Sequence, residues 1–302
     1  NSASSSAGDL VKVSIYDGAT KVGEAFFSGS ATTATSTLSQ VVSIPKNSSK
    51  VLTIKADFAG IGQDASDSAT EGHLIAIDYL NGEGTGTESG STSLLGSAAG
   101  STSASGIRLF NAFPRIARLA VPSTTLVSGT QDIYRFSITS DAKAGDFGLS
   151  LYKLTLNIST STGNATVGTS SITNVKVFAY QDAAFNTPVS GFTDGQVVAT
   201  ITALPSSGDN DAVLSSPLVI PAGSTYYFRV RGDATFTSGT GTHSHNVTTK
   251  ISGDGAYPVL AASTFMAKAS SIDSDTNDDF IWSPNATTTS GAGHIDWTNG
   301  YI

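Results

Sequence analysis

The chain has 302 residues, no cysteine and only 13% charged residues, with 16 basic against 24 acidic side chains and a net charge of −8. The missing cysteines exclude a disulfide scaffold and a thiolate metal site, and the acidic balance argues against nucleic acid as a partner, because such binding needs clustered Lys and Arg. No apolar run approaches the roughly 20 residues of a membrane-spanning helix, so we expect no membrane span.

Serine and threonine make up more than a quarter of the chain, and 39% of the residues are apolar. The apolar share is enough for a core, so the polar surface must be mostly hydroxyl rather than ionic. Such a chain is typical of a secreted, extracellular protein at the cell surface; an ordinary cytoplasmic all-β protein is the alternative. The first residues form no basic, apolar leader, so we expect that a leader has been removed or that the chain begins inside a longer precursor.

Apolar residues recur with period two almost everywhere, which predicts β-strands rather than helices. In the first part of the chain, Asp17 and Gly18 form a two-residue turn between two such strands. The predicted strands of this part are 11–16, 22–27, 38–44, 51–58 and 73–79.

Residues 82–106 are nearly all Gly, Ser, Thr and Ala, which predicts a linker or a long surface loop. Residues 107–119 are the one helix-tolerant stretch, and Pro114 interrupts it. The predicted strands beyond it are 133–139, 149–159, 175–180, 197–204, 214–220, 225–232 and 246–251.

Many short strands separated by turn residues predict an all-β chain with two immunoglobulin-like β-sandwich domains. We expect an incomplete sandwich with the linker over residues 1–105, a complete sandwich over 106–265, and a C-terminal tail over 266–302.

An internal repeat relates the two parts. Residues 11–16 (VKVSIY) match 175–180 (VKVFAY), and 38–45 (LSQVVSIP) match 214–221 (LSSPLVIP). After each proline a polar turn leads to another strand, 51–57 in the first copy and 226–233 in the second.

The first copy is incomplete. In the second copy the strands 133–139 and 149–159 precede residue 175, whereas only ten residues precede Val11. Without these two strands the first sandwich should expose an apolar face and an unpaired edge. Three interpretations remain open: a chain cut from a longer tandem array, strands supplied by a neighbouring subunit, and a smaller first domain. For the second, the tail 270–302 is the candidate donor strand.

Two segments resemble a known group of proteins. Residues 121–126 (VPSTTL), followed by 129–138 (GTQDIYRFSI), are similar to tandem β-sandwich repeats in large surface proteins of candidate-phylum bacteria. The tail motifs 279–285 (DFIWSPN) and 296–301 (DWTNGY) add to this resemblance. It implies a component of a surface layer (S-layer) or extracellular filament, and it brings no catalytic residues.

Motifs for catalysis are absent. No Gly-x-Ser-x-Gly elbow supports a serine hydrolase, no glycine-rich phosphate loop is present, and nothing selects a pair of carboxylates for a glycosidase. We therefore expect no enzyme. His243 and His245 lie two residues apart and form a weak candidate for a metal pair.

Calcium is the best ligand hypothesis, because Ca²⁺ takes six to eight oxygen ligands and one short segment is rich in them. An EF-hand is excluded, since Asp278 and Pro284 stand where that loop needs Gly and Glu. A solvated acidic turn is the alternative. Residues 209–211 and the pair Asp64 and Asp67 are weaker candidates of the same kind. The possible calcium ligands are Asp273, Asp275, Asn277, Asp278 and Asp279.

The sequence thus predicts a non-enzymatic, self-assembling structural subunit that forms a homopolymer, a filament or a surface lattice, through β-strand pairing between subunits. The pairing segments expected are 11–16, 110–121 and 279–302. The alternative is an adhesin or carbohydrate-binding module that takes a cell-surface glycan, with Trp282 and Trp297 as stacking platforms.

Overall fold

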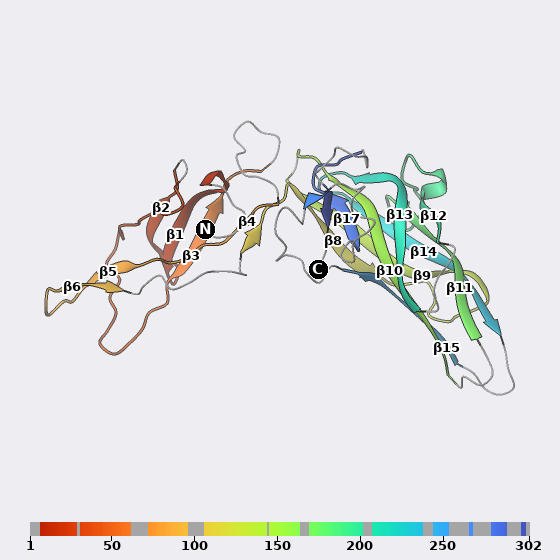
Figure 1. Ribbon diagram of the computed structural model, residues 1–302, viewed down its shortest axis with the longest axis horizontal. Helices are drawn as coiled ribbons and strands as arrows, with labels where there is room; N and C mark the ends of the chain where they lie inside the picture. Colours follow the sequence, from red (N-terminus) through yellow and green to blue (C-terminus); the bar gives the residue numbers. More distant parts are fainter. Residues whose placement is uncertain are drawn as a thin grey trace. The chain divides into compact units, whose positions relative to one another are not determined.

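The computed structural model describes residues 7–28, 31–61, 72–95, 106–143, 145–163, 169–201, 207–237, 244–253, 266–267, 279–288 and 297–299. The chain divides into two compact units, Asn1–Phe110 and Asn111–Ile302. The regular structure of the described residues is antiparallel β-sheet, interrupted by two short 3₁₀ turns, η1 (Ala7–Asp9) and η2 (Thr193–Gly195) (Figure 1). This confirms the all-β, sandwich-type fold class, while the immunoglobulin-like connectivity stays a prediction. Among the described residues no helix is long and apolar enough to cross a membrane.

The first unit is built on a three-stranded sheet with the order β2-β1-β3. The turn that joins β1 to β2 consists of Gly18 and Ala19, one residue later than predicted, because Asp17 still pairs with Thr20. Gly18 has a positive φ of 61°, which the first position of a primed hairpin turn requires. Two short ribbons complete the unit, β4 with β7 and β5 with β6. The strands are β1 (Leu10–Asp17), β2 (Thr20–Phe26), β3 (Thr53–Phe58), β4 (Leu74–Ile75), β5 (Gly82–Thr85), β6 (Thr92–Leu95) and β7 (Ile107–Arg108).

The core of the first unit is small. Leu10, Val13 and Ala25 form its buried cluster, against which half-buried residues such as Ala56 and Phe58 pack.

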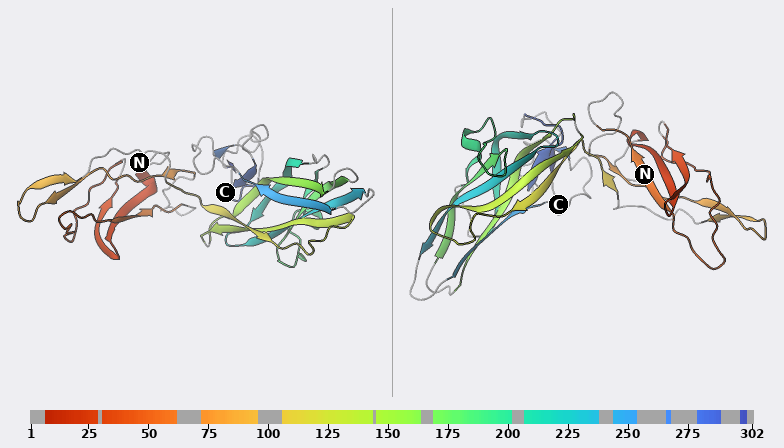
Figure 2. Two further views of the ribbon diagram at one scale, coloured as in Figure 1. Left: turned by 90° about the horizontal axis from the view of Figure 1, so that it is seen from below. Right: turned by 180° about the vertical axis from the view of Figure 1, so that it is seen from behind.

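The second unit has two sheets, whose layers Figure 2 shows. One sheet has the order β12-β11-β14-β9-β8; in the other, β10 lies between β13 on one side and β17 and β15 on the other. The sheet continues from β17 through β18 to β16. The strands are β8 (Ala112–Leu119), β9 (Gly129–Ala142), β10 (Leu149–Gly163), β11 (Thr169–Tyr180), β12 (Gln196–Ile201), β13 (Ser207–Ile220), β14 (Thr225–Thr237), β15 (Ser244–Ser252), β16 (Met266–Ala267), β17 (Phe280–Ser283) and β18 (Trp297–Asn299).

Two consecutive strands, β9 and β10, supply much of the core of the second unit. Phe136 of β9 stacks on Phe228 of β14, with ring centroids 4.7 Å apart. Seven of the eleven largest fully buried side chains of the described residues come from this strand pair, which shows how strongly the sandwich depends on it. These seven are Phe136, Ile138, Leu149, Leu151, Lys153, Leu154 and Leu156.

The structure differs from the predicted local structure in several segments. Residues 38–44 form no strand, and of 73–79 only Leu74–Ile75 is one. The expected linker 82–106 contains β5 and β6, and the helix-tolerant stretch 107–119 contains β7 and β8. Pro114 is accommodated because β8 is an edge strand, where a missing N–H can face away from the ladder.

The C-terminal tail belongs in part to the second unit. β17 pairs with β10, and its four residues are all buried. The backbone N–H of Thr155 also donates to the carbonyl oxygen of Asp279, at 2.7 Å. The part of the tail around β17 is therefore used within its own chain and is not a free donor strand for a neighbour.

A substitution in β17 tests this role of the tail. Trp282 is fully buried and its ring meets Phe113 edge-on at 5.5 Å. We expect Trp282→Ala to lower the free energy of unfolding of the second unit by about 3–5 kcal/mol, because it removes a large core side chain and leaves a cavity. Denaturant unfolding followed by far-UV circular dichroism measures the change.

The matched control for this substitution is Val127→Ala at an exposed position of the same unit, which should change stability by no more than about 0.5 kcal/mol. Equal effects of the two substitutions would contradict the assignment of β17 to the core.

Candidate assembly surface

The sheet of the first unit repeats half of a sheet in the second unit. The order β2-β1-β3 corresponds to β12-β11-β14, as the sequence repeat implies. The strand pairs β1–β3 and β11–β14 have the same register when the motifs 11–16 and 175–180 are aligned. The corresponding pairs are Val13↔Ala56 and Val177↔Val230, Ile15↔Ile54 and Ala179↔Phe228, and Tyr16↔Thr53 and Tyr180↔Tyr227.

The two sheets differ at the outer edge of their equivalent strands. In the second unit β14 pairs with β11 on one side and with β9 on the other. In the first unit the predicted edge strand 11–16 is instead the central strand β1, paired on both sides, so it is not free to pair with another subunit. β3 pairs with β1, and within the described ranges of the chain no strand lies on the other side of β3. We call this side of Thr53–Phe58 the open edge.

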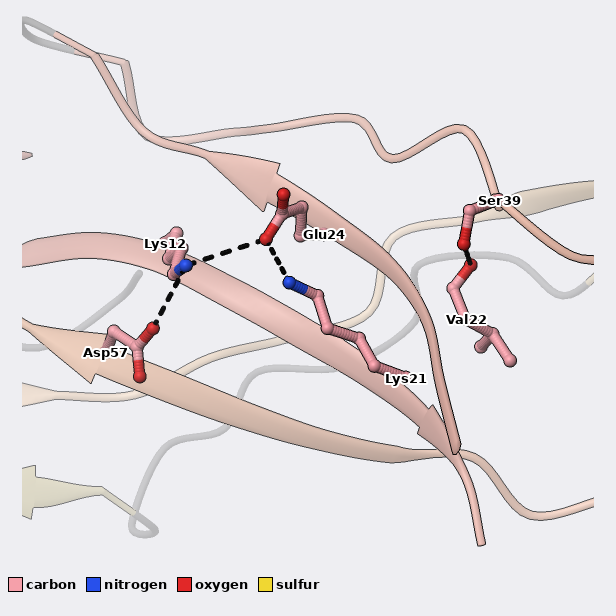
Figure 3. Close-up of polar contacts among 6 residues, drawn as sticks. All are labelled: Lys12, Lys21, Val22, Glu24, Ser39 and Asp57. Carbon is pink, nitrogen blue, oxygen red and sulfur yellow. Dashed lines mark hydrogen bonds and ion pairs between the residues drawn. The ribbon is translucent and has the colours of Figure 1, made fainter. Parts of the chain in front are cut away.

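The opposite border of the sheet, at β2, is partly covered by the chain itself. The backbone N–H of Ser39 donates to the carbonyl oxygen of Val22 at 2.7 Å, and its hydroxyl donates to the same oxygen at 3.1 Å (Figure 3). The open edge is therefore the border of this sheet at which strand pairing can continue.

Apolar side chains are unusually exposed in the first unit. Of the fifteen large hydrophobic residues exposed in the part of the chain that the structure describes, twelve lie in this smaller unit. Val41 is 93% exposed and Val51 is 84% exposed, while Ile54 on the open edge is 43% exposed. Exposed apolar side chains gathered on one unit mark it as the candidate interaction surface of the chain.

In the second unit, the residues equivalent to the exposed segment 38–44 are paired with a neighbouring strand. Residues 38–44 match 214–220 in sequence, and the latter form the end of β13, which pairs with β10. Leu149 lies opposite Ile220, and Leu151 opposite Leu218. The first unit has no counterpart of β9 or β10 among its described residues, which accounts both for the open edge and for the coil conformation of 38–44.

The outer face of the three-stranded sheet is charged. The Lys12 ammonium on the central strand bridges the carboxylates of Glu24 at 3.5 Å and Asp57 at 3.6 Å (Figure 3). Lys21 also donates to Glu24, and this hydrogen bond lowers the pKa of the Glu24 carboxyl. Lys55 on the open edge lies over the ring of Tyr16, with its Nζ 4.6 Å from the centroid.

The predicted calcium ligands fall mostly outside the described residues. Asp273, Asp275, Asn277 and Asp278 lie there, and so does the weaker pair Asp64 and Asp67. Asp279 is described, and its backbone oxygen accepts the hydrogen bond from Thr155. No group of three or more His, Asp or Glu side chains in the described residues could hold a metal ion. The calcium hypothesis stays a prediction.

The acidic residues at 209–211 bind protein groups. Asp209 accepts hydrogen bonds from Asn157 at 2.7 Å and from the Ser252 hydroxyl at 2.8 Å, which hold the pKa of this carboxyl below its usual range. Asp211 lies 3.2 Å from the Nζ of the buried Lys153. These carboxylates therefore tie β13 to β10, its neighbour in the sheet, and to the end of β15 on the far side of β10.

The histidines do not converge on one site in the described residues. The Nδ1 of His73 lies 2.7 Å from the fully buried carboxylate of Asp9, and this contact ties the residue before β4 to the end of η1. His245 stacks on Phe236 at a centroid distance of 4.8 Å. His243 and His294 lie outside the described residues, so the His243 and His245 pair is untested.

Both tryptophans are buried and cannot serve as sugar platforms. Trp282 packs against Phe113, and Trp297 packs against Tyr152 at a ring distance of 5.4 Å; neither indole is exposed. The feature that favoured a carbohydrate-binding module is thus part of the core. Comparison of the chain with protein-family models, curated proteins and solved structures gives no match.

The pKa of Asp209 gives a test in acid. Its two hydrogen bonds favour the ionised form, so the folded pKa lies below the unfolded value of about 4. This stabilisation is fully present above that value and is lost as the pH falls through the folded pKa. We expect the melting temperature of Asp209→Asn to depend less on pH than that of the wild type below about pH 4.

The Ser252→Ala variant removes one of the two donors and should also weaken the acid dependence, to a smaller extent than Asp209→Asn. Melting curves of the three proteins measured between about pH 2 and pH 6 make the comparison, and identical slopes in acid would argue against the assignment.

Proposed function

We propose that this chain is a non-enzymatic, extracellular structural subunit that assembles into a filament or surface lattice by β-strand pairing between subunits. The observation that carries the proposal is the open edge of β3, whose equivalent in the second unit, β14, is paired with β9. Resemblance to tandem β-sandwich repeats of bacterial surface proteins supports the same function.

An unpaired edge normally carries features that prevent pairing, such as proline and repelling charges. The edge strand β8 has them, with Pro114 and with the exposed Arg115 and Arg118. β3 has no proline, and it carries one lysine and one aspartate and the exposed Ile54. Its composition therefore favours pairing where that of β8 opposes it.

The surface chemistry of the chain also suits close packing between subunits. A low charged fraction and abundant hydroxyl groups lower the cost of removing water from a contact, because a hydroxyl is much less costly to desolvate than an ammonium or carboxylate. The exposed apolar side chains of the first unit would add a hydrophobic contribution on association.

A charge placed on the open edge tests this function. We expect wild-type chain to associate with rising concentration and Ile54→Lys to shift the midpoint of association to at least about tenfold higher concentration, since a lysine on the core-facing side of an edge strand opposes pairing. Light scattering coupled to size-exclusion chromatography gives the mass, and electron microscopy shows whether the assemblies are ordered.

Val127→Lys is the matched control, because it replaces an exposed valine of the second unit by the same charge. This variant should associate like the wild type. A wild-type chain that stays monomeric up to millimolar concentration would refute the proposal.

A further inference from the structure

We infer that the open edge pairs with the same edge of a second copy of this chain, strand β3 against strand β3 in antiparallel orientation about a twofold axis. The inference rests on the proposed function and names the partner and register of one of its interfaces. Because a twofold contact closes on itself, this interface forms a dimer, and a filament or lattice needs a further contact between such dimers. It joins two three-stranded sheets into one of six strands, with the order β2-β1-β3-β3-β1-β2.

Symmetry limits the possible registers. Antiparallel strands related by a twofold axis perpendicular to the sheet place each residue opposite one on the same face. The axis must then lie midway between the two copies of one residue, so that this residue faces itself. The central choices for that residue within β3 are Lys55, Ala56 and Asp57.

The charges of β3 select among these three registers. An axis at Lys55 sets the two Lys55 side chains opposite each other, and an axis at Asp57 does the same with the two Asp57 side chains; like charges directly opposite are destabilising. An axis at Ala56 instead places Lys55 of each copy opposite Asp57 of the other. Two complementary pairs form, and the two alanines meet at the axis.

Within the first unit, the contacts of Lys55 and Asp57 leave both side chains able to pair with the second copy. Asp57 is 56% exposed and contacts Lys12 through Oδ2, so its carboxylate can accept further hydrogen bonds. Lys55 is exposed and projects on the same face as Asp57, since the two are separated by one residue along the strand. Its ammonium lies over the Tyr16 ring, and the three N–H donors of an ammonium let it also bind a carboxylate.

The apolar face agrees with the same register. An axis at Ala56 places Ile54 of one copy opposite Phe58 of the other, twice. Ile54 is 43% exposed, and the half-buried Phe58 packs on the core cluster of Leu10, Val13 and Ala25. Pairing therefore covers Ile54 and extends the core-facing surface of both sheets across the interface.

Cysteine cross-linking of the full chain tests this register, and the natural absence of cysteine makes a single introduced thiol unambiguous. Residues directly opposite at the axis have their Cβ atoms close to the separation that a disulfide needs. We expect Ala56→Cys to form a covalent dimer under mild oxidation. Ala117→Cys, an exposed alanine on the edge strand β8, is the control and should not.

Charge substitutions in the Ala56→Cys background then test the partners. Lys55→Glu places acidic groups opposite each other, and Asp57→Lys places basic groups opposite each other, so each variant alone should cross-link about fivefold less than the parent. A mixture of the two restores two complementary pairs. Mass spectrometry should find mostly heterodimer in that mixture.

Asp57→Lys also removes the ion pair with Lys12, so each variant is first compared with the parent by circular dichroism and melting. If Asp57→Lys does not fold, Lys55→Gln takes its place. Lys55→Gln removes the attraction between position 55 and Asp57 of the other copy without adding a like charge, so its cross-linking should fall between that of the parent and that of Lys55→Glu.

The outcomes separate the two levels of the argument. Two results would overturn the β3–β3 pairing and leave the proposed assembly standing: oligomers in which Ala56→Cys does not cross-link, or a cross-linking yield that is the same in the parent and in the variants at positions 55 and 57. A chain that forms no oligomers would overturn both. Selective cross-linking with recovery in the mixture supports both.

Discussion

Pairing at the edges of its sheets is the constraint on which the structure of this chain depends. A strand presents backbone N–H and C=O groups on both sides and apolar side chains on at least one face, and folding must satisfy both needs. The second unit does so with its own strands, because β9 covers the edge of β14 and β10 covers β13. The first unit has strands equivalent to β11, β12 and β14 and meets the same need only in part.

The absence of counterparts of β9 and β10 among the described residues of the first unit affects its core as well as its backbone hydrogen bonding. β9 and β10 carry most of the largest buried side chains of the second unit, so a sheet without their counterparts has little apolar material to pack on. The first unit accordingly has a small core around Val13 and many exposed apolar residues. The coil at 38–44 follows from the same cause, since a segment with strand propensity forms a strand only when a partner is within reach.

The sequence allowed the all-β class and most strands to be predicted, because alternation of apolar and polar residues depends only on neighbouring positions. The internal repeat also indicated which strands lack a counterpart. Within each of its two copies the equivalent strands pair in the same register. Residues 38–44 were mispredicted since alternation carries no information about the partner. The roles of Trp282 and Trp297 could not be predicted either, because an isolated aromatic residue gives the same signal in a core and on a sugar-binding surface.

Scarcity of charge would give the few charged residues of this chain more influence on the proposed association. In a surface crowded with lysines and carboxylates, one pair more or less would hardly select a register. The edge of β3 has two charges of opposite sign, separated by one small residue, on a strand whose other face is apolar. A hydroxyl-rich surface permits close contact without choosing a partner, and the alternation of Lys55, Ala56 and Asp57 supplies the choice. Specificity then comes from the cost of the wrong registers as much as from the gain of the right one.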